Sequence, residues 1–217
     1  TVLVSGAAGV CGAMLGQMAK ILGCRVIGTA GSDDKVRHLK EVLGFDEALN
    51  YKTFSTADSM QGALARAAPE GIDFYFDNTA GHVTTAAWPL LRDGARVAIC
   101  GGIAHYFDKP GWWSHKVWGK ELPLEEDGSA PIGETPMGAG PVTTVSRGRR
   151  IVVEALVWKQ LHDREPYEED FYRQVPQWIS EGRLRVDETI LEGFERLPEA
   201  FAGLFQGQNL GKMLVHV

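Results

Sequence analysis

The sequence predicts an α/β protein built on a doubly wound parallel sheet. Three observations predict it. Short apolar runs, typical of strands buried on both faces, alternate with amphipathic helical patterns over the first hundred residues. A glycine-rich turn, Gly6 to Gly12, follows the first apolar run and opens the first helix. Glycine makes up 26 of 217 residues without an even repeat, so many glycines should lie at turns or close to a ligand.

The expected elements follow one another as strand and helix. The first strand, residues 1–5, is apolar and ends at Gly6, and the helix after it, residues 12–22, stops at Gly23. Ser32 is a suitable cap for the second helix, which Gly44 ends. The other expected strands are 24–30, 46–50, 72–77 and 96–100, and the other helices are 57–67 and 83–91. This order predicts parallel pairing with right-handed crossovers.

The second half of the chain is less regular. Residues 104–149 are rich in proline and glycine and read as one long loop. We expect a strand at 151–158, a helix at 171–179, and a tail of strand, helix and strand at 184–191, 197–205 and 212–217. Gly182 ends the helix at 171–179, and the tail follows it. The apolar strand 151–158 is expected at an edge of the sheet, where it would pair two copies as a homodimer.

Composition excludes several function classes. Lys plus Arg is 22 and Asp plus Glu is 28, a net charge of −6, which argues against a nucleic-acid or anionic-membrane partner. No apolar run is long enough to span a bilayer. The three cysteines, Cys11, Cys24 and Cys100, form no CxxC pair, and we interpret them as reduced core residues of a cytoplasmic protein. The six histidines form no metal-binding motif, so no metal is expected.

The turn after the first strand has the spacing of a dinucleotide-binding fingerprint, which is characteristic of the Rossmann fold. Gly9 and Gly12 match its last two glycines, and Ala7 stands where the first glycine is usual. A glycine at position 9 lets a pyrophosphate approach backbone N–H groups, and one at position 12 lets the helix pack closely on the strand. The simpler alternative is a tight turn without a ligand.

The end of the second strand indicates which nucleotide the site prefers. An NAD site needs a carboxylate there, but Ala30 and Gly31 leave room for a 2′-phosphate instead. Lys35 follows in the first turn of a helix, where a cation opposes the helix dipole and calls for an anion nearby. The sequence therefore favours NADP. Two alternatives stay open: Lys35 pairs with Asp33 or Asp34 on the surface, or Asp33 itself binds the ribose of NAD.

Several motifs occur in one order along the chain, at residues 6–12, 30–36, 43–46, 50–53, 71–78, 100–103 and 207–212. Together they resemble the zinc-independent medium-chain dehydrogenase/reductases, in the branch of leukotriene B4 12-hydroxydehydrogenase, prostaglandin reductases and 2-alkenal double-bond reductases. The resemblance covers most of the chain outside residues 104–148. It implies NADPH-dependent reduction of the carbon–carbon double bond of an α,β-unsaturated aldehyde or ketone, by hydride transfer to the β-carbon.

The resemblance also implies a set of site residues. Gly9 to Gly12 would hold the pyrophosphate, Lys35 and Tyr51 the 2′-phosphate, and Asn209 would reach the nicotinamide. For the asparagines, the alternative is a turn-forming role. Tyr106 is the nearest candidate proton donor, with an ordinary loop tyrosine as the alternative. The full cofactor set is Gly9, Val10, Cys11, Gly12, Gly31, Ser32, Lys35, Tyr51, Asn78, Cys100, Gly101, Gly102, Ile103 and Asn209.

Family members carry a GroES-like substrate domain before the first strand, and no such domain precedes Thr1 in this sequence. The resemblance therefore implies that residues 1–182 form the NADP-binding Rossmann domain and that residues 183–217 return to the substrate domain. We expect that the chain lacks the full catalytic domain. Two other functions stay open: an NADPH-dependent quinone reductase, and a non-catalytic NADPH-binding module.

Overall fold

The computed structural model describes residues 1–105, 141–156 and 165–217, and for residues 165–167 it describes the backbone alone. Its main feature is a seven-stranded sheet in the order β3-β2-β1-β4-β5-β7-β6. Every neighbouring pair is parallel except β6 and β7. This is the doubly wound order in which the chain builds outward from β1 in both directions, and it confirms the predicted fold class.

The elements of the first hundred residues lie close to their predicted positions. The strands are β1 Val2–Val4, β2 Val26–Ala30, β3 Glu47–Asn50, β4 Ile72–Asp77 and β5 Leu91–Ile99. The α-helices are α1 Val10–Ile21, α2 Asp33–Glu41, α3 Ala57–Ala67 and α4 His82–Ala87, with short 3₁₀ turns at Tyr51–Thr53, Trp88–Leu90 and Ile103–His105. The expected helix 83–91 is thus shorter than predicted, because a 3₁₀ turn ends it and β5 already begins at Leu91.

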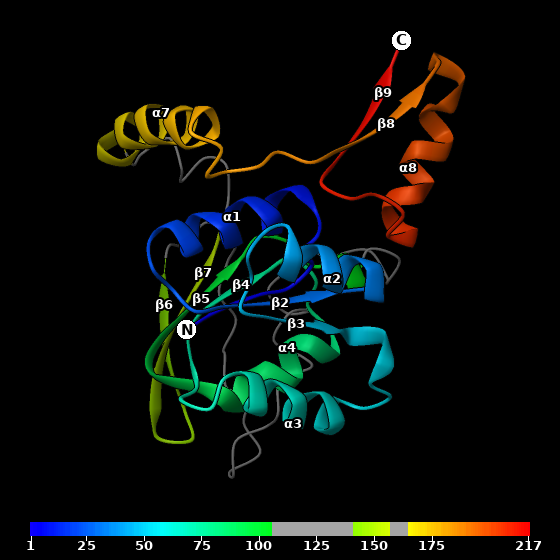
Figure 1. The fold of residues 1–217 in the computed structure, drawn as a ribbon. Helices are drawn as coiled ribbons and strands as arrows, with labels where there is room; N and C mark the ends of the chain where they lie inside the picture. Colours follow the sequence, from blue (N-terminus) through cyan, green and yellow to red (C-terminus); the bar gives the residue numbers. More distant parts are fainter. Residues whose placement is uncertain (106–140, 157–164) are drawn as a thin grey trace.

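Helices cover the sheet on both faces, with α1 and α2 on one side and α3 and α4 on the other (Figure 1). Successive residues of β1 point to opposite faces, so Leu3 packs into the core beneath α3 and α4 while Val2 and Val4 pack beneath α1 and α2. All three are buried. The continuous apolar run of the first strand follows from this double burial, as predicted.

The outer edge of the sheet differs from the prediction. Strand β7, Arg149–Ala155, pairs with β5 on one side and with β6, Val142–Ser146, on the other. The segment expected at the edge is therefore internal, and β6 is the edge strand of the described sheet. The predicted loop 104–149 is also wrong at its end, because β6 and the tight turn at Arg147 and Gly148, both with positive φ, lie within it.

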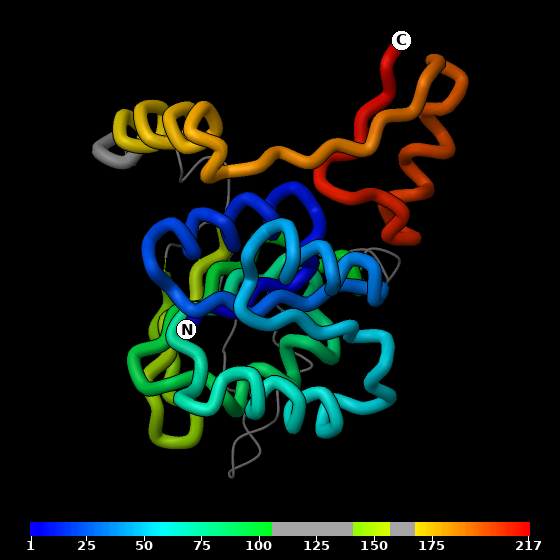
Figure 2. The backbone as a smooth tube through the Cα atoms, viewed as in Figure 1, coloured from blue at the N-terminus to red at the C-terminus, as the bar shows by residue number. Residues whose placement is uncertain are grey.

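The tail forms a small unit apart from the main sheet. After helix α7, Glu165–Ser180, the chain runs in extended form across α1, as Figure 2 shows, to β8, Glu188–Glu192. Helix α8, Leu197–Gln206, then leads to β9, Lys212–His216, which pairs with β8 in parallel. The expected order of strand, helix and strand is confirmed, whereas the domain boundary at residues 182 and 183 stays a prediction.

Candidate cofactor site

The turn between β1 and α1 is shaped by close backbone packing. A Cβ atom on Gly12 would lie 2.6 Å from the Gly6 carbonyl oxygen and 2.7 Å from the Ala7 Cα atom, so the turn accepts only glycine at this position without moving. A Cβ atom on Gly9 would meet the Gly6 carbonyl oxygen at 3.4 Å, an ordinary contact. The packing of the chain therefore requires glycine at position 12 but not at position 9. For Gly9, the fingerprint gives a different reason for glycine, which is the close approach of a ligand to the backbone.

The start of α1 has features suited to an anion. Gly9 is the N-cap residue and supplies no side-chain hydrogen bond, and the first turn contains no acidic side chain. The N-terminal N–H groups of a helix carry partial positive charge and lack partners within the helix. Val10, Cys11 and Gly12 form this first turn, so the backbone there can receive a pyrophosphate.

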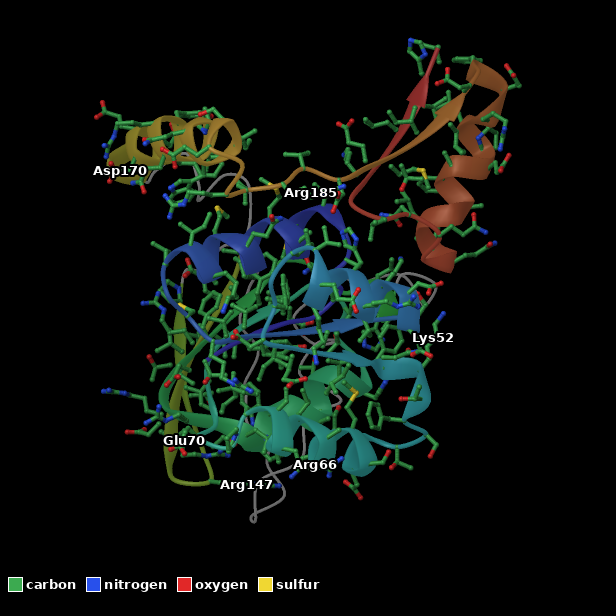
Figure 3. The ribbon with its side chains drawn as sticks, in the orientation of Figure 1. Lys52, Arg66, Glu70, Arg147, Asp170 and Arg185 are labelled. Atoms are coloured by element: carbon green, nitrogen blue, oxygen red, sulfur yellow. The ribbon has the colours of Figure 1, made fainter. Side chains whose placement is uncertain are left out.

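A second cluster lies at the carboxyl ends of β2 and β3, around Gly31. A Cβ atom on Gly31 would lie 3.1 Å from the Tyr51 hydroxyl oxygen and 3.3 Å from Lys52 Cε, so these side chains stand directly over the glycine. Burial lowers the pKa of Lys35, and the nearby Lys52 ammonium lowers it further. Burial also raises the pKa of Tyr51. Two ammonium groups and a neutral hydroxyl thus converge here, and Figure 3 shows Lys52 at this edge of the sheet.

The contacts of Lys35 rule out its pairing with the neighbouring carboxylates. Its Nζ donates to the Gly207 carbonyl oxygen at 2.7 Å, while its backbone N–H donates to the Ser32 hydroxyl at 3.3 Å and confirms the predicted cap. Asp33 instead accepts a hydrogen bond from the Asn50 side chain at 2.8 Å, and Asp34 pairs with Arg37. The ammonium of Lys35 therefore lies between α2 and the tail and is bonded to the backbone of Gly207.

Asn78 is held against the first turn. Its backbone N–H donates to the Ser5 hydroxyl at 2.8 Å, and its side-chain amide donates to the Ser5 carbonyl oxygen at 2.7 Å. The buried Asp77 carboxylate fixes the same corner by accepting from the hydroxyls of Ser5 and Thr84, each at 2.6 Å. These bonds join the carboxyl ends of β1 and β4.

The segment after β5 is held to the same corner. The backbone N–H groups of Cys100 and Gly101 both donate to the Asp77 carbonyl oxygen, at 2.7 and 3.1 Å. Ile103 donates to the Asn78 carbonyl oxygen at 3.5 Å, and a Cβ atom on Gly102 would lie 3.8 Å from Ala80 Cβ. The predicted segment of residues 100–103 therefore lies beside Asn78.

The cysteines do not match their predicted core positions. Cys11 and Cys100 are exposed and Cys24 is half-buried, because the first two lie at the open carboxyl edge of the sheet. The neighbouring Cys100 thiol lowers the pKa of Cys11. All three thiols are free, as expected.

The tail reaches the first turn through Gly211. Its N–H donates to the Ala8 carbonyl oxygen at 2.8 Å, and it forms an isolated bridge with Gly9. Asn209 lies two residues earlier, and its amide donates to the Gly211 carbonyl oxygen at 2.7 Å, which is the turn-forming role left open above. The same region places Lys212 close enough to influence the charge on Cys11. Lys52 and Lys212 lie beside these two groups of residues and were not among the predicted site residues.

The structure therefore brings the predicted cofactor residues to one edge in two groups. Gly31, Ser32, Lys35 and Tyr51 surround one position, and residues 9–12, Asn78 and 100–103 surround the other, with Asn209 held beside it. Tyr106 lies outside the described residues. In the described ranges, no group of three or more His, Cys, Asp or Glu side chains is placed to hold a metal ion.

Known proteins are similar to this chain in sequence and in fold. Residues 10–111 match the protein family described as zinc-binding dehydrogenase. The chain is 38% identical over 223 residues to prostaglandin reductase 1 of Bos taurus, and 41% identical over 217 residues to YfmJ of Bacillus subtilis, which bears the name of an NADP-dependent oxidoreductase. These alignments cover 99% and 100% of the chain and 56% of each relative.

The same likeness appears among solved structures. CurA from Vibrio vulnificus in complex with NADPH superimposes with a TM-score of 0.73 at 32% identity, covering 100% of this chain and 56% of CurA. Together with the fold and the order of the motifs, these matches support the predicted resemblance to the zinc-independent medium-chain dehydrogenase/reductases. The chain spans about half the length of the curated relatives that it matches.

The two groups of predicted site residues lie where an open parallel sheet binds its ligand, at the carboxyl ends of the strands on both sides of β1. In the parts of the chain that the structure describes, no helix is both long and apolar enough to span a bilayer.

Proposed function

We propose that the protein is an NADPH-dependent oxidoreductase that reduces the carbon–carbon double bond of α,β-unsaturated aldehydes or ketones. The observation that carries the cofactor choice is the cluster of Lys35, Lys52 and Tyr51 around Gly31. A 2′-phosphate has two negative charges at most, and it is matched by two ammonium groups and a hydroxyl donor. The names of the relatives support the same cofactor.

The proposed roles follow from position. The uncapped first turn of α1 would bind the pyrophosphate, and Gly9 would let it approach the backbone. Asn78 and residues 100–103, which are hydrogen-bonded to each other, would line the nicotinamide half of the site together with Asn209. Bound NADPH supplies the hydride. Because hydride delivery to the β-carbon leaves an enolate, a proton donor is also needed, and Tyr106 is our candidate for that role.

The remaining expectations belong to the same proposal. The partner is a small enal or enone, the location is the cytoplasm and the protein acts as a homodimer. Since β6 is the edge of the described sheet, pairing through β6 replaces the predicted pairing through residues 151–158.

The test compares substrate classes in the full-length protein. We expect NADPH oxidation with simple enals and enones, followed by its absorbance, and slower oxidation with NADH. Product analysis should show a saturated carbonyl with deuterium at the β-carbon when deuterated NADPH is used, and Tyr106→Phe should lower kcat more than KM. Turnover of quinones alone would identify a quinone reductase, and NADPH binding without any turnover would identify a binding module. Either result overturns the proposed reaction.

A further inference from the structure

Two rings from distant parts of the chain meet at the carboxyl edge of the sheet. Tyr51 begins the 3₁₀ turn after β3, and His82 is the first residue of α4, which follows β4. The centroids of the two rings lie 5.7 Å apart, and the ring planes are inclined by 58°. Because β2 and β1 lie between β3 and β4 in the sheet, this contact joins the loops on the two sides of these central strands.

The two rings differ in how they are held. Tyr51 is half-buried and packs against the core cluster beneath α3 and α4, and its hydroxyl oxygen lies 3.1 Å from the Cβ position of Gly31. His82 is exposed, and within residues 1–105, 141–156 and 165–217 its imidazole has no hydrogen-bond or ion-pair partner. The packing therefore fixes Tyr51, while the His82 ring rests on it and is open to solvent.

The proposed position of the 2′-phosphate brings another part of NADPH close to these rings, and this step rests on the proposed function. The 2′-phosphate and the adenine are attached to neighbouring carbon atoms of one ribose. With the phosphate over Gly31, beside the Tyr51 hydroxyl, the adenine lies no more than one ribose away. The 5′ side of the same ribose leads to the pyrophosphate at the first turn of α1, which leaves the base on the side of α4.

We propose that His82, supported by Tyr51, is the residue on which the adenine of the cofactor stacks. An imidazole presents a flat π surface, and stacking of a base on an aromatic side chain raises affinity by about 5- to 150-fold. A stack uses the face of the ring and needs no hydrogen bond. His82 then recognises the base of the nucleotide, whereas the cluster around Gly31 recognises its 2′-phosphate, so the two contacts are separable by mutation.

Replacement of His82 in the full-length protein separates these contacts. Calorimetry should measure the affinity of NADPH and of NADH, which share the adenine and differ in the 2′-phosphate. His82→Ala should weaken both nucleotides by the same factor, about fivefold or more, because the lost contact is with the base. His82→Phe keeps a flat ring and should bind both nucleotides as wild type does. His216→Ala is the matched control and should change neither affinity, since His216 is also exposed but lies on β9 and pairs with Glu192 at 2.8 Å.

A second measurement does not depend on affinity. The proton signals of the His82 ring, assigned by their absence in His82→Phe, should shift upfield in NMR spectra when 2′,5′-ADP is added, because a stacked base exerts a ring current. Inorganic phosphate can occupy the phosphate positions but carries no ring, and it should not cause this shift.

Unchanged nucleotide affinities in His82→Ala would overturn the proposal. A loss confined to NADPH, or an equal loss in His82→Ala and His82→Phe, would also overturn it, because the contact would then be polar and not a stack. Circular dichroism of each variant checks that the fold is kept. Failure of the wild-type protein to bind either nucleotide would contradict the proposed function and this inference with it. Wild-type binding of NADPH that does not depend on His82 would contradict the stacking role alone.

Discussion

Replacing Lys35 by alanine tests the cofactor proposal most directly. The change removes one of the two ammonium groups near Gly31 and the hydrogen bond to the Gly207 carbonyl oxygen. A charge-assisted hydrogen bond to a phosphate contributes about 1.5–3 kcal/mol. In the free protein Lys35 already has Gly207 as a partner at 2.7 Å, so binding a phosphate exchanges one contact for another. We therefore expect the lower end of that range, about tenfold in affinity.

Calorimetry or tryptophan fluorescence should measure the affinity of NADPH and of NADH for each variant. Lys35→Ala and Lys52→Ala should each weaken NADPH and leave NADH nearly unchanged, and the difference should shrink in high salt. Lys40→Ala is the matched control, because Lys40 also lies on α2 but pairs with Glu47 at 3.1 Å. Equal wild-type affinities for the two nucleotides, or equal losses in Lys35→Ala, would refute the reasoning and leave Asp33 as the residue that reads a ribose hydroxyl.

Two further predictions concern the framework of the site. Gly12→Ala should destabilise the chain by about 1–3 kcal/mol in urea unfolding, because its Cβ atom would collide with backbone atoms of Gly6 and Ala7. Gly62→Ala, at an open position of α3 where the nearest atom is 3.7 Å away, should instead stabilise it by up to about 1 kcal/mol, and a loss as large as that of Gly12→Ala would contradict the packing argument. Asp187 joins the tail to α2, because its carboxylate Oδ2 lies 2.7 Å from Nε2 of His38. Burial alone would raise the pKa of Asp187, but the hydrogen bonds from Arg185 and His38 lower it. The charged carboxylate should stabilise the fold above the ordinary aspartate pKa of about 4, and this effect should disappear as the pH falls through the lowered pKa. Asp187→Asn should therefore lower the free energy of unfolding at neutral pH but not in strong acid. A difference in the free energy of unfolding that stays constant across pH would contradict this.

Most of the sheet could be predicted because, over the first hundred residues, the pattern of each segment agrees with the alternating order of strands and helices. Helix α3 and strand β4 occupy the predicted residues, since α3 has a capped amphipathic pattern and β4 is a short aromatic-rich run that follows Gly71. Strand β6 was missed for the opposite reason. It is short, follows a proline-rich stretch, and turns into β7 through Arg147 and Gly148, a pair without the usual sequence signature of a tight hairpin.

The site was predictable in position more than in composition. The carboxyl ends of parallel strands meet at one edge, so any residue that follows β1, β2, β4 or β5 is a candidate. Lys52 was missed because its approach to Gly31 depends on the 3₁₀ turn at Tyr51–Thr53, which the sequence pattern did not indicate. The exposure of Cys11 and Cys100 was missed because their apolar and glycine-rich sequence neighbourhood indicated a buried core. Both residues instead lie at the open carboxyl edge of the sheet.

The bonds that hold this edge together explain why the position of the site was easier to predict than its side chains. The side chains of Ser5, Asp77 and Asn78 join β1 to β4 at this edge. Other segments are joined through backbone groups: Cys100 and Gly101 donate to the Asp77 carbonyl oxygen, and Gly211 donates to the carbonyl oxygen of Ala8. Such bonds form with nearly any side chain, so the spacing of the motifs determines where the loops lie but does not determine what their side chains do.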